Sequence, residues 1–169
     1  MRKLDDILKA VYRKDHGTLA QASLAELNDV DLDGRTPLMH AVLEGDSETV
    51  RLLIGRGVDV NVSDRAQRWT ALHFAARDQN DAVVGSLLDA GAAIDPVDVF
   101  GNTPLWRSVM NASSTLGAIQ ELLKHGADIH KKNRYGEAPI DVARKTGRDD
   151  LAAVLEKGAS EQGKQRKSK

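Results

Sequence analysis

The sequence predicts an all-α solenoid, in which pairs of short helices stack side by side along one axis. The first observation is a phrase that occurs four times with small changes: TPLMHAVL from Thr36, TALHFAAR from Thr70, TPLWRSVM from Thr103 and APIDVARK from Ala138. These phrases start 34, 33 and 35 residues apart, and a period of this size is typical of stacked helical repeats. The second observation is the composition: aromatic residues make up only 4% of the 169 residues, which favours closely packed helices over a β-sandwich.

Each phrase contains the residues that begin a helix and pack it against its neighbours. Thr36, Thr70 and Thr103 are expected to accept a hydrogen bond from a backbone N–H of the first turn, which otherwise has no partner. A proline is tolerated at the first helical position, because the N–H that it lacks has no hydrogen-bond partner within the helix. A leucine or isoleucine then makes the first core contact, and alanines let neighbouring helices approach closely. The residues concerned are Pro37, Pro104 and Pro139, then Leu38, Leu72, Leu105 and Ile140, then Ala41, Ala75, Ala76 and Ala143.

A second helix is predicted in each unit, because apolar residues recur three and four positions apart. Val84, Leu87 and Leu88 show this spacing in the second unit. A glycine that adopts the left-handed conformation is expected to end this helix in three units, and a short projecting hairpin then leads to the next phrase. These glycines are Gly57, Gly91 and Gly126.

The phrase TALHFA at residues 70–75 follows the arrangement T-P-L-H-x-A, and on this basis the chain resembles the ankyrin-repeat family. The resemblance covers about residues 28–157, and the chain looks like a small, stand-alone array of the bacterial kind. It implies an ankyrin solenoid of helix-turn-helix units with short β-hairpin loops.

One ankyrin-repeat domain is therefore expected over residues 1–158. Residues 1–30 are expected to form two short capping helices, because they are amphipathic and lack the phrase. Residues 159–169 are expected to be a disordered basic tail. The expected repeats are 31–63, 64–97, 98–132 and 133–157, and the last of them caps the C-terminal end.

The residue pattern does not support catalysis. The chain has no cysteine, which excludes disulfides, thiolate nucleophiles and Cys-ligated zinc. His73 is expected to bond to Thr70 and to nearby backbone, which is a structural role. His125 and His130 are five residues apart across a glycine turn, so they do not share a helix face as a metal pair would. No nucleophilic triad or phosphate-binding glycine loop is present, so we expect no catalytic residue, no metal site and no cofactor.

The resemblance implies a binding surface made of the hairpin tips and the C-terminal ends of the first helices. Several of these positions hold large apolar residues beside charges, which is typical of anchors in protein interfaces. Trp69 is expected to face outward, because Arg68 stands where the other tips have glycine. Phe100 and Tyr135 either face a partner or pack between neighbouring hairpins, and Trp106 either extends over the floor of the groove or packs beneath a hairpin. The predicted contact residues are Leu32, Asp33, Arg35, Leu43, Glu44, Trp69, Arg77, Asp78, Val99, Phe100, Asn102, Trp106, Met110, Arg134 and Tyr135.

Charge is distributed unevenly along the chain. Residues 15–98 carry fifteen acidic and six basic groups, although the net charge of the whole chain is only −1. An acidic first half argues against binding to nucleic acid, which needs a basic face. It favours a protein partner with a basic surface.

The predicted function is non-catalytic protein recognition by an array that is monomeric when free. A narrower hypothesis is a toxin-neutralising immunity or antitoxin protein, and the alternative is a scaffold or chaperone-like assembly partner of a housekeeping enzyme. Asp5, Asp6 and Lys9 interrupt the apolar run that a signal peptide needs, and no stretch has the apolar length of a membrane span. A cytoplasmic location without a membrane partner is therefore expected.

Overall fold

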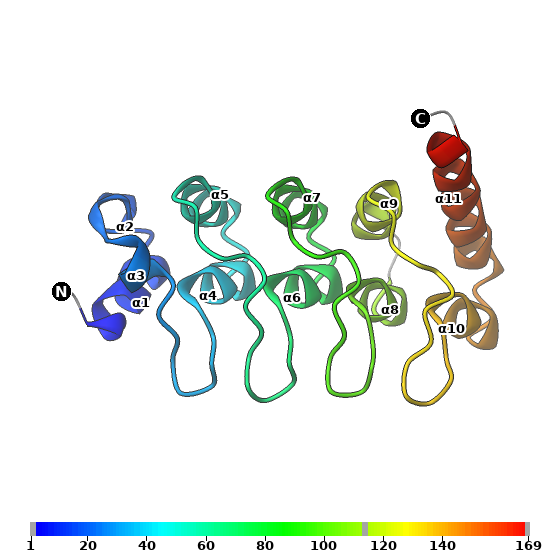
Figure 1. The fold of residues 1–169 in the computed structure, drawn as a ribbon, viewed down its shortest axis with the longest axis horizontal. Helices are drawn as coiled ribbons and strands as arrows, with labels where there is room; N and C mark the ends of the chain where they lie inside the picture. The colour runs from blue at the N-terminus through cyan, green and yellow to red at the C-terminus, as the bar shows by residue number, and fades with distance from the viewer. Residues whose placement is uncertain (1–2, 113–114, 168–169) are drawn as a thin grey trace.

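Short helices stack in two rows, as the sequence predicts. The computed structural model describes residues 3–112 and 115–167. Figure 1 shows an inner row of helices, from which long loops project downward, and an outer row above it. The inner row contains α4 (Pro37–Leu43), α6 (Ala71–Arg77), α8 (Pro104–Met110) and α10 (Pro139–Lys145), and the outer row contains α5 (Ser47–Gly55), α7 (Asp81–Asp89), α9 (Gly117–Lys124) and α11 (Asp149–Lys167). The all-α solenoid is confirmed.

The projecting loops reverse direction without forming strands. Among residues 3–112 and 115–167, the β-type pairing is limited to an isolated bridge between Ser63 and Thr70. A backbone hydrogen bond joins the two ends of each loop, such as that from Asp98 N to Asn102 O at 3.0 Å. The β-hairpins expected from the sequence are therefore tight loops, because the paired segments are too short for a ladder.

The inner helices begin where the repeated phrase places them. The hydroxyl of Thr36 accepts a hydrogen bond from Met39 N at 3.2 Å, and that of Thr103 accepts one from Trp106 N at 3.1 Å. Ala138 has no such hydroxyl; instead the carboxylate of Asp141 accepts a bond from Ala138 N at 3.0 Å. These three helices thus satisfy part of their exposed first turn, and each cap contributes about 1 kcal/mol.

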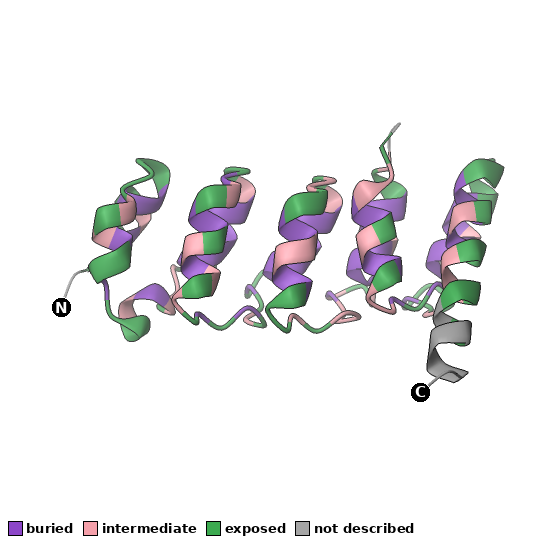
Figure 2. Ribbon diagram, turned by 90° about the horizontal axis from the view of Figure 1, so that it is seen from above, coloured by how far each residue is buried: buried purple, intermediate pink, exposed green. Residues whose placement is uncertain are grey.

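The core lies between the two rows and runs the length of the molecule. Figure 2 shows buried residues on the facing sides of successive helices, with exposed residues on their outer sides. The core leucines and alanines of the phrase are buried, and burial of one leucine contributes roughly 2 kcal/mol. The glycines Gly57, Gly91 and Gly126 have φ angles of 79°, 88° and 95°, which confirms their left-handed conformation.

The N-terminal cap contains one helix more than expected. Helices α1 (Leu4–Tyr12) and α2 (His16–Gln21) are followed by a third, α3 (Leu24–Leu27). The short α3 begins with a capping box, in which Ser23 and Glu26 bond to each other's backbone N–H groups. Ile7 and Val11 of α1 are buried in the core. The cap therefore covers the N-terminal end of the first full unit.

The C-terminal segment differs from the disordered tail expected at residues 159–169. Helix α11 continues without a break to Lys167, while residues 168–169 lie outside the described residues. A methyl group added at Gly158 would lie only 2.7 Å from Leu123 Cδ1, so α11 packs closely on α9 at this point. Ala159 is half-buried against the core, and Ser160 Oγ donates to Glu156 O at 2.9 Å. These contacts extend the helix beyond the expected boundary at residue 158.

Candidate protein-binding surface

Each projecting loop ends in a tip that is folded by its own first side chain. We define tips 1 to 4 as residues 31–35, 64–69, 98–102 and 133–137. In tip 1, Asp31 Oδ1 accepts hydrogen bonds from Asp33 N and Arg35 N, both at 2.9 Å. Asp64, Asp98 and Asn133 accept corresponding bonds in the other tips. The acidic or amide side chain that opens each tip therefore has a structural role.

Backbone hydrogen bonds join each tip to the next. Arg65 N donates to Asp33 O at 2.8 Å, and Val99 N donates to Gln67 O at 3.0 Å. The third bond runs from Arg134 N of tip 4 to Phe100 O of tip 3 at 2.9 Å. The four tips consequently form one continuous edge of the molecule.

The approach between tips 3 and 4 requires a glycine. Gly101 has a φ of 81°, a region that other residues avoid. A Cβ at this position would lie 2.9 Å from Arg134 N. Any side chain at residue 101 would therefore disturb both the turn and the bond to the next tip.

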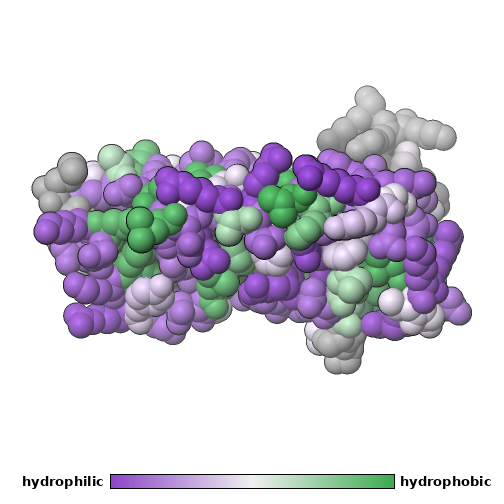
Figure 3. All heavy atoms as spheres, turned by 90° about the horizontal axis from the view of Figure 1, so that it is seen from below, coloured by the Kyte–Doolittle hydropathy of each residue, from purple (hydrophilic) through white to green (hydrophobic). Residues whose placement is uncertain are grey.

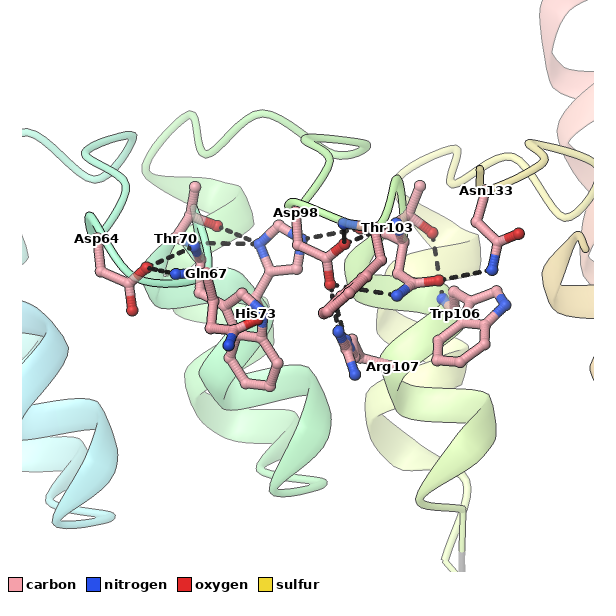
Figure 4. A network of polar contacts seen from close by, with 12 residues as sticks. Asp64, Gln67, Thr70, His73, Asp98, Thr103, Trp106, Arg107 and Asn133 are labelled. Carbon is pink, nitrogen blue, oxygen red and sulfur yellow. Dashed lines mark hydrogen bonds and ion pairs between the residues drawn. The ribbon is translucent and has the colours of Figure 1, made fainter. Parts of the chain in front are cut away.

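A buried polar network lies behind tips 2 to 4 (Figure 4). His73 Nδ1 accepts a hydrogen bond from Thr70 N at 3.2 Å, and its Nε2 lies 3.2 Å from Asn102 O. These bonds confirm the structural role expected for His73. The amide of Asn102 in turn accepts a bond from Asn133 Nδ2 at 2.8 Å, so the network spans three units.

Two ionisable groups of this network have shifted pKa values. Burial lowers the pKa of His73 to about 4, so the imidazole is neutral at pH 7. Burial alone would raise the pKa of Asp98, but hydrogen bonds from Arg107 and from two backbone N–H groups lower it. The side chain of Arg107 donates to Asp98 Oδ2 through Nε at 3.0 Å and also through a terminal nitrogen. Asp98 is therefore an ionised, fully paired carboxylate.

Trp69 does not face outward, which corrects the expectation from the sequence. The exposed fraction of Trp69 is 8%, and its ring centroid lies 5.0 Å from that of Phe74. Arg68 stands at the position of the usual tip glycine and adopts a φ of 57°. Trp69, the next residue, is turned inward, and its backbone N–H donates a hydrogen bond to Asp64. Trp69 thus supports the surface from below.

Guanidinium groups cover the buried aromatic rings. Arg107 and Arg77 lie 4.8 Å and 5.3 Å from the ring centroid of Trp69, and Arg35 lies 5.7 Å from that of Phe74. Each such cation–π contact contributes about 0.5–1 kcal/mol at a partly exposed site. Trp106 is half-buried against the core with Arg107 over its ring at 5.4 Å, which favours the packed alternative for this residue.

The predicted contact residues differ in exposure. The exposed ones include Leu32 (95%), Tyr135 (72%), Met110 (50%) and Phe100 (40%). Asn102 is buried in the polar network and cannot reach a partner, which corrects a second expectation. The remaining exposed residues are Asp33, Glu44, Asp78 and Arg134, and the half-buried ones are Arg35, Leu43, Arg77, Val99 and Trp106.

The structure brings the tip residues together but leaves others separate. Phe100 and Tyr135 stack with ring centroids 6.5 Å apart and an interplanar angle of 26°. They therefore pack on each other across two tips while both stay accessible. Met110 lies at the C-terminal end of α8, and no hydrogen bond or ring contact of the described residues joins it to the tips. Figure 3, which views the side from which the loops project, shows apolar patches separated by hydrophilic side chains.

Three residues of this surface were missed by the sequence reasoning. Arg65 is exposed on tip 2, while Asp98 and Arg107 form the ion pair behind tip 3. A signal for the pair was present: Arg107 follows Asp98 by nine residues, and His40 follows Asp31 by the same interval. His40 Nε2 and Asp31 Oδ2 are also bonded, at 2.8 Å. In these two units the residue nine positions after the tip carboxylate is therefore its partner.

None of the helices in the described residues combines the length and the apolar character needed to cross a membrane.

Comparisons with known proteins agree with this architecture. The family described as "Ankyrin repeats (3 copies)" matches residues 7–98, and "Ankyrin repeat" matches residues 100–134. Serine/threonine-protein kinase 12 of Arabidopsis thaliana is 37% identical over 119 residues, which are 70% of this chain and 24% of the kinase. SMC5-SMC6 complex localization factor protein 1 of Homo sapiens is 30% identical over 167 residues, which are 91% of this chain and 16% of that protein. Inversin of Gallus gallus is 37% identical over 125 residues, which are 72% of this chain and 11% of inversin.

The chain spans less than a quarter of the length of each of these relatives. The family match nevertheless covers more than half of the chain, and the stacked units, the His73 bonds and the glycine-ended helices follow the same pattern. The chain belongs to the ankyrin-repeat family.

Proposed function

We propose that this chain recognises another protein through the strip formed by tips 1 to 4 and the C-terminal ends of the inner helices. Ankyrin repeats generally mediate protein–protein interactions. The observation that carries the proposal here is the Phe100–Tyr135 pair, whose rings are exposed on a bonded row of tips. Large aromatic side chains on a preorganised support make effective anchors, because little conformational freedom is lost on binding.

The proposed role is non-catalytic. Ankyrin domains are typically interaction modules, and the ionisable groups of this surface support a structural role. His73 is neutral and bonded at both ring nitrogens, and Asp98 is held by Arg107. Neither is positioned to exchange a proton with a bound molecule.

A narrower form of the proposal is a toxin-neutralising immunity or antitoxin protein that binds a basic surface. Its support is the exposed pair of acidic residues Asp33 and Glu44 at the N-terminal end of the strip. The proposed location is the cytoplasm, in line with a sequence that has no cysteine. The free chain is proposed to be monomeric, since α1 covers one end of the array and α11 the other; sedimentation at micromolar concentration measures this.

Affinity capture from a lysate of the source cells tests the main proposal. The wild-type chain is compared with a Phe100→Ala, Tyr135→Ala variant and with Leu24→Ala, which removes an exposed apolar side chain of α3 outside the strip. The specific partner is expected with the wild type and Leu24→Ala but not with the double variant. Equal recovery by all three proteins contradicts the proposal. For the narrower form, co-expression of the chain is expected to restore growth to cells that express the captured partner as a toxin.

A further inference from the structure

The exposed charge of tips 2 to 4 is opposite in sign to that of the first half of the sequence. The acidic residues of these tips are all engaged. Asp64 and Asp98 are buried, and each accepts backbone hydrogen bonds within its own tip. Glu137 is half-buried and forms an ion pair with Lys145. Each carboxylate of tips 2 to 4 therefore already has a partner within the chain.

The arginines of these tips remain available. Arg68 and Arg134 are exposed, and among the described residues neither side chain has a hydrogen bond or an ion pair. Arg65 is also exposed, and its guanidinium makes a single bond, from Nη1 to Leu32 O at 3.2 Å. Tips 2 and 4 thus present unpaired cations, whereas the arginines on the helices behind them are paired with Asp78 and Asp98.

Apolar groups lie between these cations on the same edge. Val99 and Phe100 belong to tip 3, which is bonded through its backbone to Gln67 of tip 2 and to Arg134 of tip 4. Tyr135 follows Arg134 and stacks on Phe100. The edge therefore presents arginine, then an apolar and aromatic group, then arginine again.

We propose that tips 2 to 4 bind an acidic segment of a protein partner that also carries apolar side chains. This inference rests on the proposed function and specifies the chemistry of the partner. Guanidinium groups form strong, bidentate hydrogen bonds with carboxylates, and the stacked rings offer apolar area to the side chains between those carboxylates. A partner that meets Asp33 and Glu44 with basic groups would place its acidic, apolar part over tips 2 to 4.

A protein segment fits this edge better than a nucleic acid does. A phosphate backbone is bound by many cations, whereas this edge has three and the whole chain has a net charge of −1. Bases of single strands stack on open aromatic faces, but Phe100 and Tyr135 turn a face toward each other. Carboxylates spaced by apolar side chains match both features.

Selection from a random dodecapeptide display library tests the inference without knowledge of the natural partner. The immobilised wild-type chain is expected to select peptides enriched in Asp and Glu together with Phe, Leu or Trp. The Arg68→Gly, Arg134→Ala variant is expected to bind the selected peptides about tenfold more weakly, because one solvent-exposed ion pair is lost at each of two tips. Arg51→Ala removes an exposed arginine of the outer helix α5 and is expected to leave the affinity unchanged.

The design separates this inference from the proposed function. Peptides that are neutral or basic, but that lose binding to the Phe100→Ala, Tyr135→Ala variant, overturn the inference and leave the strip as the binding site. Acidic peptides that bind the arginine double variant as tightly as the wild type also overturn the inference. If neither double variant changes the affinity for the selected peptides, the result contradicts both the inference and the proposed function. Tighter binding of an oligothymidylate than of the peptides, with the same dependence on Arg68 and Arg134, overturns the inference and identifies the ligand of this edge as a nucleic acid.

Discussion

The Nε2 atom of His73 lies 3.2 Å from the carbonyl oxygen of Asn102, so a buried imidazole bonds the second unit to the third. The same ring accepts a hydrogen bond from Thr70 N at the start of its own helix. One side chain thus fixes the start of α6 and its distance from the next tip. Both bonds require the neutral ring with its proton on Nε2.

Acidification is expected to destabilise the fold through His73. Burial lowers its folded pKa to about 4 from the usual 6.5. Between these values the unfolded chain binds more protons than the folded chain, so the free energy of unfolding falls as the pH decreases. The complete effect is on the order of 3 kcal/mol. Urea denaturation at a series of pH values measures this effect, and His73→Gln is expected to flatten the pH dependence. An unchanged slope in His73→Gln would show that another group is responsible.

Removal of the Asp98 carboxylate is expected to destabilise the chain strongly. Asp98→Ala leaves Arg107 and two backbone N–H groups of tip 3 without their acceptor, at an expected loss of about 3–5 kcal/mol. Asp98→Asn is expected to lose less, because Asn133 folds tip 4 with an amide in the same place. Chemical denaturation of both variants provides the measurement. Equal stability of Asp98→Ala and the wild type would contradict the structural role of this carboxylate.

Arg68→Gly is expected to stabilise the chain while it removes a charge from tip 2. Arg68 has a φ of 57°, a conformation that is unfavourable for a residue with a Cβ by about 1 kcal/mol. Glycine occupies the tips of the other units, at Gly34, Gly101 and Gly136, with φ angles of 77–81°. The free energy of unfolding should rise by up to about 1 kcal/mol, whereas Arg134→Ala should leave it unchanged. A destabilised Arg68→Gly would mean that the arginine side chain supports tip 2.

Trp69→Ala and Tyr135→Ala are expected to have opposite consequences. Trp69 is buried beneath two guanidinium groups, so its truncation should cost about 3–5 kcal/mol of stability. Tyr135 is mostly exposed, so its truncation should change stability by less than about 0.5 kcal/mol and weaken only partner binding. Thermal melts of both variants, together with binding measurements, distinguish the roles. A stable Trp69→Ala variant would argue for the outward orientation expected from the sequence.

The repeated phrase predicts the architecture because its requirements are local. Hydroxyl caps at Thr36 and Thr103, the bond from Thr70 N to His73 Nδ1 and the glycines after the outer helices act within a few residues of their own positions. Such local requirements are visible in a single sequence. The stack follows because each unit has the same apolar face.

The surface is less predictable, because it depends on contacts between units. Trp69 is covered by Arg107, which lies in the next unit, and sequence spacing does not reveal that contact. The net acidity of residues 15–98 likewise does not describe the exposed charge of tips 2 and 3. Asp64 and Asp98 are buried there and accept hydrogen bonds within their own tips. Helix α11 extends beyond residue 158 because Gly158 meets Leu123 of α9, another contact made only in three dimensions.

The backbone hydrogen bonds between neighbouring tips need no particular side chain, which has a consequence for how such an array can diverge. Every amino acid except proline supplies the N–H that residues 65, 99 and 134 donate. These three main-chain bonds therefore form with any side chain except that of proline. Descendants of this gene could acquire new specificities by exchange at three codons, with the distances between contact points inherited intact.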